Sequence, residues 1–534
     1  MSKNQEPLVE LDAEELRKLG KLCQSLPVSA EERAMLGALI ETIAWLLIEL
    51  EKKSTTLAYL RESLSITTKK TEKTDEVLRR NGAKASKTGK GPKKPKSKPK
   101  GHGRHAASAY KDADKVDVPL ESLTACDSCP GCIRGKVYRH EPKCLVRLKG
   151  RAPIAATVWE IESLRCNLCG EVFRADVPPE ATGPKYDESA ASMIALLKYG
   201  SGLPFYRLAG LQSALGIPLP ASTQWDVIKK ASGIVAPACK ELIRQAAQGS
   251  VFYNDDTTVK VLALMEENQK NKDAGLKERT GMFTTAVLAL TDKGLITLYL
   301  TGRKHAGENL GDVLKRRAQD LGIPIQMCDG SSRNKPTSFT TWLANCLAHG
   351  RRKFVEVAHN FPGPCRHVLE TLAKVYKNDA AARKGKLSPL DRLRFHKKHS
   401  AKHMARLKHW MLQQFEQRKV EPISPLGAAF SYMLDRWDKM TLFLRRPGAP
   451  LDNNLCELSL KKAILHRKNA LFYKTTDGAD VGDIFMSLIY TAQLAGANPF
   501  DYLTQLLKHG EALKSSPQEW MPWNYKTAVE AAGS

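Results

Sequence analysis

Four acidic residues stand where strands or helices are expected to end or begin. Asp255 and Asp256 follow the apolar run that starts at Val251, Asp329 follows "IPIQMC", and Glu457 lies near the start of a later helix. Strand ends of an α/β sheet bring side chains from distant segments into one crevice. Carboxylates gathered there repel one another unless a divalent cation neutralises them, and hard oxygen ligands select Mg²⁺ or Mn²⁺. Two such ions activate the attacking oxygen and stabilise the leaving oxygen in phosphodiester displacement.

Spacing alone does not single out these acids from the 57 Asp and Glu residues of the chain. For each acid the alternative is a helix cap or a surface charge. At Glu457 that alternative is specific, because Asn454 followed by Glu457 three residues later fits the reciprocal capping box. The helix behind Glu457 is basic, and its cations are available for DNA phosphates or for charge balance. They are Lys461, Lys462, Arg467 and Lys468.

Two Cys-x-x-Cys pairs predict a zinc site. "CDSCPGC" begins at Cys126 and "CNLCG" at Cys166, with a strand-rich interval between them. Four thiolates at this spacing close a tetrahedral site around a structural Zn²⁺. The best ligand set is Cys129, Cys132, Cys166 and Cys169. Cys126 also pairs in register with Cys129, and Cys144 and His140 are further candidates. Buried or redox-active cysteines are the alternative interpretation.

The segments around the acids predict a mixed sheet with helices on its faces. Three β-rich runs follow residue 250, "SVFYNDDTTVKVLAL", "TGMFTTAVLAL" and "GLITLYL", and the last two are close enough to form a hairpin across "TDKG". A helix over "ENLGDVLKRRAQDLG" and a fourth strand over "IPIQMCDG" come next. Three strands, a helix and another strand indicate an α/β unit. Residues 366–446 are expected to be almost wholly helical.

A helix pair precedes this sheet. "LPFYRLAGLQSALG" and "ASTQWDVIKKASGIV" are expected to be helices joined by the turn "IPLP", with Ser222 or Thr223 capping the second helix. Such a pair places a recognition helix, here carrying Gln224, Lys229 and Lys230, in a DNA major groove. Helix pairs are common, so an ordinary helical hairpin is the alternative.

The N-terminal region combines a heptad pattern with a basic run. Apolar residues recur every seven positions at Leu36, Ile43, Leu50, Leu57 and Leu64. This period favours a coiled coil, with an intramolecular helical hairpin as the alternative. Residues 81–104 contain nine Lys or Arg, three prolines and no acid. They predict a disordered tether that contacts phosphates without reading sequence.

The formal net charge of +26 over 534 residues makes an anionic polymer the favoured partner, and nucleic acid is the first candidate. A chain of this length divides into roughly three or four units. The sequence has no run of about 18 apolar residues that would span a membrane, and its polar first ten residues lack a signal-peptide core. We therefore expect a cytoplasmic protein whose cysteines are thiols or metal ligands.

Five features, in the same order, resemble bacterial insertion-sequence transposases of family sixty-six, which have an Asp-Asp-Glu triad on a ribonuclease-H-like fold. They are the knuckles "CPGC" and "CNLC", the "LPFYR" helix, "YNDDT", "CLAHGRRKF" and "DNNLCE" with "RKNALF". With "AGANPFDYLTQLL" near the end, the resemblance covers residues from about 125 to 505. The chain departs from the family pattern at Leu458, where Arg is common, and in "SSRNKP", where Tyr is common. Both changes bear on DNA contacts beside the site.

The resemblance implies that Asp255, Asp329 and Glu457 form a catalytic triad that holds two Mg²⁺ or Mn²⁺ ions. Water would attack the phosphodiester at a transposon end, and the freed 3′-hydroxyl would attack target DNA. His349 and Arg352 match a family motif and are assigned to the scaffold or to phosphate positioning. The expected DNA contacts are Lys229, Lys230, Arg351, Arg352, Lys461, Lys462, Arg467 and Lys468.

The predicted organisation is that of a multidomain α/β protein. Its parts are an N-terminal helical or leucine-zipper region (1–66), a basic linker (67–112), a zinc-ribbon-like domain (113–180), a helix-turn-helix-like DNA-binding domain (181–248), a ribonuclease-H-like catalytic domain (249–478) with a helical insertion (366–446), and a C-terminal helical region (479–534). Expected partners are transposon-end and target DNA at the nucleoid, a second copy of the chain and small accessory proteins of the same element. The alternatives are a zinc-stabilised DNA-binding protein without transposition activity and a plain nuclease on the same fold.

Overall fold

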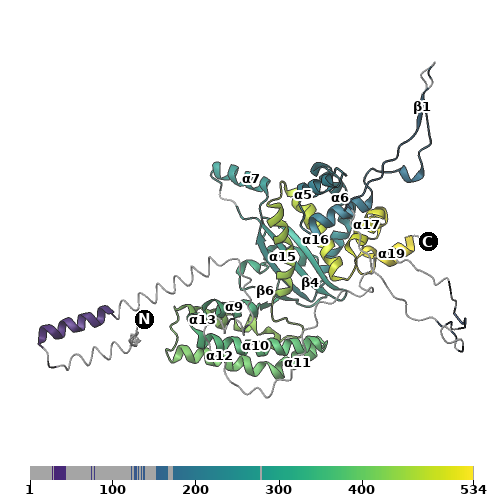
Figure 1. The fold of residues 1–534 in the computed structure, drawn as a ribbon. Coiled ribbons are helices and arrows are strands. Elements are labelled where there is room, and N and C mark those ends of the chain that lie inside the picture. The colour runs from purple at the N-terminus through teal and green to yellow at the C-terminus, as the bar shows by residue number, and fades with distance from the viewer. Residues whose placement is uncertain are drawn as a thin grey trace. The chain divides into compact units, whose positions relative to one another are not determined.

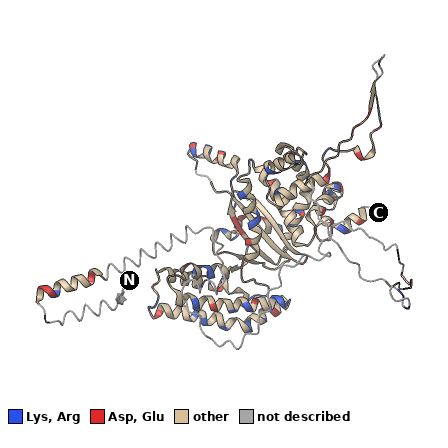
Figure 2. Cartoon of the chain, in the orientation of Figure 1, with Lys and Arg blue, Asp and Glu red and all other residues tan. Residues whose placement is uncertain are grey.

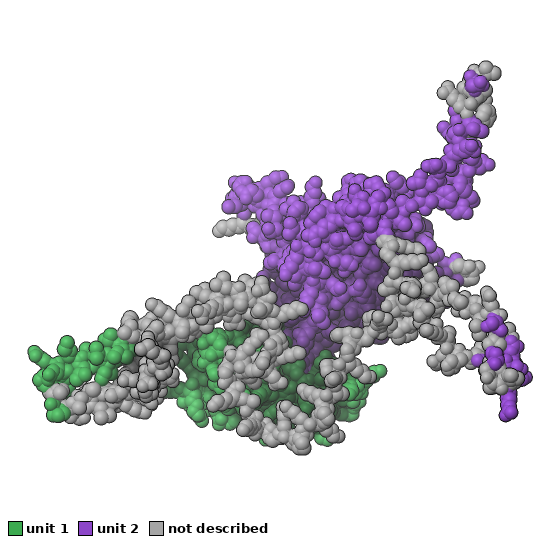
Figure 3. Space-filling view, in the orientation of Figure 1, with its two compact units in different colours: residues 1–85, 347–447 green, residues 86–346, 448–534 purple. Residues whose placement is uncertain are grey.

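The chain divides into two compact units in the computed structural model (Figure 3). Residues 1–85 and 347–447 form the helical unit, and residues 86–346 and 448–534 form the sheet unit. The structure describes residues 27, 29–43, 74, 77, 122, 125–128, 130, 134, 136, 138, 152–165, 167, 172–276 and 279–532. The predicted zinc ligands, the basic run and most of the heptad positions lie outside these residues.

A five-stranded sheet forms the centre of the sheet unit (Figure 1). Its strands are β3 (Val251–Thr258), β4 (Phe283–Thr291), β5 (Gly294–Gly302), β6 (Ile325–Cys328) and β7 (Trp342–Asn345). Their order is β5-β4-β3-β6-β7, in which β3, β4 and β5 are antiparallel neighbours and β6 and β7 join in parallel. The predicted hairpin across "TDKG" is confirmed, because Thr291 pairs with Gly294. Strand β7 was not predicted.

Helices cover both faces of this sheet. The helices of this unit are α4 (Glu188–Ala195), α5 (Phe205–Ala214), α6 (Ala221–Ala246), α7 (Leu262–Asp273), α8 (Ala306–Leu314), α15 (Asn454–Ala470), α16 (Thr476–Leu494), α17 (Pro499–Lys508), α18 (Gly510–Ser515) and α19 (Tyr525–Ala532). Of these, α6, α8, α15 and α16 pack directly on the strands. Asn309 of α8 donates to Thr285 Oγ1 (2.8 Å), whereas Tyr299 donates its hydroxyl to the Ser459 carbonyl of α15 (2.8 Å). Tyr299 pairs with Ala286, the residue after Thr285, so the two side chains leave opposite faces. Helices α8 and α15 therefore pack on opposite faces.

The edge strand β5 is covered by α16 rather than left open. Three side chains of α16, spaced four residues apart, accept hydrogen bonds from alternate N–H groups of the strand. Thr491 accepts from Thr297 (3.1 Å), Ser487 from Tyr299 (2.9 Å) and Asp483 from Thr301 (2.5 Å). Four helical residues rise about 6 Å and two strand residues about 6.7 Å, so the two repeats match. This pairing satisfies donors that would otherwise invite another strand.

The helix pair before the sheet differs from its prediction at the start of α6. The N-cap is Pro220, and no side chain caps the helix, so the expected cap by Ser222 or Thr223 is wrong. Pro favours the extended backbone that precedes a helix, which sets the boundary without a polar cap. Gln224 is fully buried and donates to the Leu219 carbonyl (2.9 Å), so its amide stabilises the turn. Helix α6 continues for 26 residues and packs on β4 and β5.

A short hairpin precedes the main body of the sheet unit. Strands β1 (Ser163–Arg165) and β2 (Val172–Arg174) are antiparallel, and Ser163 pairs with Arg174. The second Cys-x-x-Cys pair falls in the connection between these two strands.

The helical unit contains α9 (Leu347–Val357), α10 (Pro362–Lys384), α11 (Pro389–His399), α12 (Ala401–Glu416), α13 (Pro425–Asp435), α14 (Trp437–Met440) and the 3₁₀ turn η5 (Leu442–Leu444). The predicted helical character of residues 366–446 is confirmed. Phe430 of α13 packs against Phe354 of α9 and Trp410 of α12, so aromatic contacts hold the helices together. Within the part of the chain that the structure describes, no helix has the length and apolarity needed to cross a bilayer.

Candidate active site

The two neighbouring acids of β3 face opposite sides of the sheet. Asp255 pairs with Ala286, which shares its face with Tyr299 and hence with α15, whereas Asp256 pairs with Thr285 on the face of α8. Asp256 accepts a hydrogen bond from the Ala306 N–H at the start of α8 (3.2 Å). A carboxylate that lies at the N-terminus of a helix is stabilised by the helix dipole. Asp256 therefore supports α8, and Asp255 is the acid of this pair on the α15 face.

Asp329 follows β6 and falls on the same face as Asp255. Tyr253 of β3 pairs with Met327 of β6 in parallel register, and the two acids each stand two residues farther along. Because side chains alternate along a strand, this spacing directs both carboxylates to one side of the sheet. Asp329 Oδ1 accepts from the Ser331 N–H (2.8 Å) and from the Asn334 amide (2.6 Å). Its position is thus fixed by the turn that follows β6.

Glu457 lies in the first turns of α15, and the capping interpretation of Asn454 is wrong. The N-cap is Asn453, which makes no side-chain cap bond, and Asn454 is the first residue of the helix. A capping box needs the acid three residues after the N-cap, a position that Cys456 occupies here. The Glu457 carboxylate is therefore not used to cap its own helix. Helix α15 packs on β3 and β4, and Glu457 is half-buried.

The charges of Asp329 and Glu457 both affect the pKa of Asp255. Burial raises the pKa of Asp255 to about 7, and the charge of Asp329 adds to this shift, as do those of Asp256 and Glu457; the hydrogen bond from the Asp256 N–H opposes it (2.9 Å). Carboxylates that raise each other's pKa carry an energetic cost that a cation removes. These three acids would offer carboxylate oxygens, which suit a hard divalent cation such as Mg²⁺ or Mn²⁺.

A buried amide network ties together the segments that carry these acids. Asn254 donates to the Asn334 carbonyl (2.8 Å), and Gln326 donates to that carbonyl (2.6 Å) and to Asn254 Oδ1 (2.9 Å). Asn453 donates to the Asn254 carbonyl (3.3 Å). The four amide side chains are at most 3 % exposed. They link β3, β6, the turn after β6 and the start of α15, each of which carries or adjoins one acid.

This network was not predicted from the sequence. Its only sequence signal is the presence of Asn254 directly after the apolar run at the start of β3 and of Gln326 within the buried strand β6. Buried amides are costly unless hydrogen-bonded, so such residues indicate a partner elsewhere in the chain. The partner Asn334 lies within "SSRNKP", where the sequence departs from the family pattern.

The four cations of α15 divide into two kinds. Arg467 donates to Thr257 Oγ1 (2.8 Å) and to the Thr258 carbonyl, so it ties α15 to β3. Lys462 lies 5.9 Å from the centre of the Tyr490 ring. Lys461 and Lys468 are exposed. The exposed pair is open to an anionic ligand, whereas the other two contribute to packing.

The remaining expected DNA contacts occupy both units. In the sheet unit, Lys229 of α6 pairs with Asp477, and the neighbouring Lys230 is exposed. In the helical unit, Arg351 and Arg352 of α9 are half-buried. Arg351 donates to Thr74 Oγ1 (3.3 Å) within that unit. His349 lies on the same helix, and it is also half-buried.

Comparisons with known proteins identify the family. The model of the "Transposase IS66 family" matches residues 184–481. The "Uncharacterized protein y4jD" of Sinorhizobium fredii (strain NBRC 101917 / NGR234) is 32% identical over 377 residues, which cover 68% of this chain and 71% of that protein. The "Uncharacterized protein y4hP" of the same strain is 24% identical and covers 79% of this chain and 77% of its own length. The family match extends over more than half of the sequence and includes Asp255, Asp329 and Glu457, and the chain belongs to the IS66 family of transposases.

Proposed function

We propose that the chain is a transposase of the Asp-Asp-Glu type, in which Asp255, Asp329 and Glu457 form the catalytic triad on a ribonuclease-H-like sheet. The observation that carries this proposal is the strand register, which places Asp255 and Asp329 on the same face of the sheet, the face on which α15 with Glu457 packs. Family membership supports DNA as the substrate. The sheet, with three antiparallel strands followed by two parallel ones, is compatible with this fold.

The triad acids and Asn334 have different proposed roles in the reaction. Asp255, Asp329 and Glu457 would hold two Mg²⁺ or Mn²⁺ ions, which activate an attacking oxygen and stabilise the leaving oxygen in phosphodiester displacement. Asp255 would be the ligand shared between the ions, and Asp329 and Glu457 would each complete the coordination of one ion. The Asn334 amide holds Asp329 before substrate binds, so little reorganisation is needed during the reaction. This reaction requires no covalent link between the chain and DNA.

Exposed cations of α15 and α6 are the proposed contacts to DNA phosphates. Lys461 and Lys468 lie on the helix that carries Glu457, and Lys230 lies exposed on α6. Each phosphate contact adds affinity that does not depend on base sequence and weakens with salt. Arg467 and Lys229 already have protein partners, so their substitution should disturb folding as well as DNA binding. A second copy of the chain and accessory proteins remain predictions.

The proposal is tested with the full chain, Mg²⁺ and linear DNA that carries both ends of its own element. We expect nicks that free 3′-hydroxyl groups at those ends, followed by joining to a plasmid target. DNA with scrambled ends should give neither product. Cleavage of any DNA without joining would favour the plain nuclease, and specific binding without cleavage would favour the DNA-binding protein.

The amide network gives a second prediction. Asn334→Ala removes the donor that holds Asp329 Oδ1, so the half-saturating Mg²⁺ concentration for cleavage should rise by about 10- to 100-fold. The measurement is cleavage rate against Mg²⁺ concentration. The control Asn360→Ala changes an exposed asparagine of the helical unit and should leave the curve in place. An unchanged Mg²⁺ requirement in Asn334→Ala would show that the network does not position the acid.

We also propose that Cys129, Cys132, Cys166 and Cys169 bind one structural Zn²⁺. The β1–β2 hairpin supports this ligand set, because the second cysteine pair lies in the sequence between its two strands. Elemental analysis of the double variant Cys166→Ser with Cys169→Ser should show the loss of about one zinc per chain. Cys239→Ala removes a buried thiol of α6 and should keep the metal. Zinc retained in the double variant would reject the ligand set.

A further inference from the structure

The sheet unit contains a groove between α6 and the corner at which α17 ends and α18 begins. Its volume is about 770 Å³. One wall includes Lys230, Ile234 and Pro237, whose spacing of four and three residues places them on one face of α6. The other wall is formed by residues 507–512 and Lys514. The family match ends at residue 481, so this second wall lies outside the part of the chain that the family model covers.

Packing fixes the second wall against α6. A Cβ added at Gly510 would lie 2.8 Å from Ile234 Cγ2, so the absence of a side chain at Gly510 allows the corner to come this close. The His509 ring stacks on the buried Trp520, with ring centres 5.0 Å apart. The corner that carries Lys508 is therefore held in place from both sides.

The charge of the groove does not follow from the composition of the C-terminal region. Residues 499–534 contain three lysines and four acids, and both signs of charge occur on these helices (Figure 2). Two of these lysines, Lys508 and Lys514, line the groove, whereas Glu511 is the one acid among the described lining residues. Together with Lys230 of α6, the lining holds three lysines and one carboxylate.

The three lysines are available to a ligand. Lys230, Lys508 and Lys514 are exposed, and none of them forms an ion pair within the part of the chain that the structure describes. The two other α6 residues expected near DNA already have protein partners. Gln224 is buried and donates to the Leu219 carbonyl, and Lys229 pairs with Asp477. Lys230 is thus the α6 cation that an external anion can reach.

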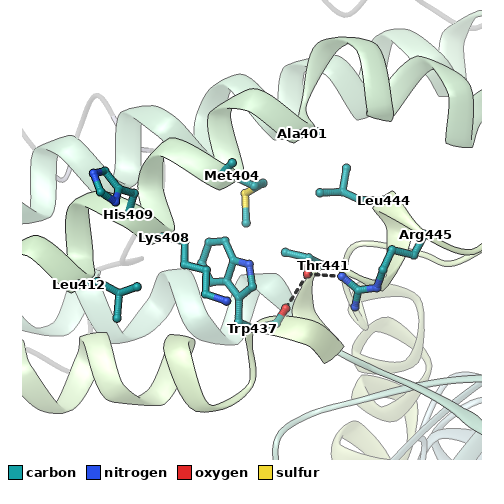
Figure 4. A pocket seen from close by; sticks show the side chains of 10 residues that line it. Ala401, Met404, Lys408, His409, Leu412, Trp437, Thr441, Leu444 and Arg445 are labelled. Carbon is teal, nitrogen blue, oxygen red and sulfur yellow. Dashed lines mark hydrogen bonds between the residues drawn. The ribbon is translucent and has the colours of Figure 1, made fainter.

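A pocket of the helical unit, between α12 and α14, lacks this accessibility (Figure 4). Its Trp437 is 7 % exposed and has Lys408 Nζ 5.9 Å from its ring centre, and Thr441 is 1 % exposed. Figure 4 shows Thr441 bonded to Arg445 and to the Trp437 carbonyl. These side chains serve the packing of their own unit, whereas the lysines of the groove extend into solvent.

We propose that the groove between α6 and the α17–α18 corner binds the sugar–phosphate backbone of DNA, with phosphates at Lys230, Lys508 and Lys514. Ammonium groups on two walls suit a row of phosphates, which releases counterions when it is neutralised. The described lining contains no Arg, Asn or Gln for bidentate contacts to base edges, so the groove positions DNA without reading its sequence. This inference rests on the proposed action on DNA, and it adds a phosphate-binding surface that the C-terminal helices complete.

The test measures the affinity of the full chain for duplex DNA in EDTA, at several salt concentrations. Each phosphate contact contributes about 0.9 to the slope of log K against log salt. The triple variant Lys230→Gln, Lys508→Gln, Lys514→Gln should therefore reduce the magnitude of this slope by about 3, equally for transposon-end DNA and for scrambled DNA. Glu511→Gln should tighten binding, because it removes the one acid of the described lining.

Lys526→Gln is the matched control, since Lys526 is an exposed lysine of α19 outside the groove lining. It should leave the slope unchanged. A second readout is the rate at which an acetylating reagent modifies each lysine, followed by mass spectrometry. Bound DNA should slow the modification of Lys230, Lys508 and Lys514 and leave that of Lys526 unaffected.

The proposal would be overturned by an unchanged slope in the triple variant, by equal acetylation with and without DNA, or by weaker binding of Glu511→Gln. Displacement of DNA from the three lysines by polyglutamate of equal charge and at equal potency would assign the groove to an acidic protein instead. If the original chain nicks transposon ends but the triple variant keeps the slope, this inference alone fails. If the triple variant loses the slope but the original chain nicks no DNA in Mg²⁺, the proposed function alone fails.

Discussion

Asp255→Asn is expected to reduce cleavage at transposon ends by a factor of about 10³ or more. The substitution keeps the size of the side chain but removes the charge that both metal ions would share, and such ions supply several kcal/mol of transition-state stabilisation. Asp329→Asn and Glu457→Gln should have effects of similar size. The measurement is the rate of 3′-end nicking at saturating Mg²⁺, with thermal unfolding followed in parallel to verify that each variant is folded.

Asp256→Asn is the matched control for this experiment. Asp256 is the next residue along the same strand, but it faces α8 and accepts from the Ala306 N–H. An asparagine can still accept that hydrogen bond through its side-chain oxygen. We expect the Asp256 variant to retain cleavage within a fewfold of the original rate. If Asp256→Asn abolished cleavage while Asp255→Asn left it intact, the assignment of the two acids would have to be reversed.

The sequence predicted the strands that precede the acids, because strand ends and turn residues are local features. The assignment of the acids to a triad came from the family resemblance and stays a prediction. The choice between Asp255 and Asp256 came from the family motif, whereas the physical reason is the register of β3 with β4, which directs one acid to each face. Register depends on the pairing of distant segments and is not a local property. The same limitation explains why strand β7, which pairs only with β6, was missed.

Two errors concern helix boundaries. The predicted caps at Asn454 and at Ser222 or Thr223 assumed helix starts that differ by one to three residues from those observed. Helix ends are set by the packing of the whole segment, so a capping pattern alone fixes them poorly. At α15 the correction affects function, because Asn453 uses its amide to hold Asn254 instead of capping the helix. The predicted cap, Asn454, is thus the neighbour of Asn453, the residue whose amide links the start of α15 to β3.

The four cations of the basic helix α15 have different structural roles, which its amino-acid composition does not reveal. Its four cations look equivalent in sequence, yet Arg467 joins the helix to β3 and Lys462 contacts Tyr490. Only Lys461 and Lys468 are exposed. Helix α15 therefore presents one acid to the site and two exposed cations to an anionic partner.

Metal affinity should depend steeply on pH below about 7. The pKa of Asp255 is raised to about 7, mainly by burial and by the neighbouring Asp329, compared with about 3.9 in an unfolded chain. The folded, metal-free protein therefore favours the protonated acid, and this contribution to stability is lost as pH rises from about 4 through 7. A divalent cation binds the ionised form and must displace the proton. Apparent Mg²⁺ affinity should rise about 100-fold between pH 5 and pH 8 and change little above that.

The test is a Mg²⁺ or Mn²⁺ titration of the full chain at several pH values, followed by the shift in unfolding temperature. Asp255→Asn should abolish the steep pH dependence of the metal affinity. Asp483 provides the control, because burial also raises its pKa to about 7 but its carboxylate bonds to Thr301 at the edge of the sheet. Asp483→Asn should change the pH dependence of stability and leave that of metal affinity intact. The pKa of both acids is raised to about 7, so their effects must be separated. The proton is assigned to the metal site if the pH dependence of metal affinity disappears in Asp255→Asn and remains in Asp483→Asn. A metal affinity that stays constant from pH 5 to pH 8 in the original chain would contradict the role of Asp255 as a ligand.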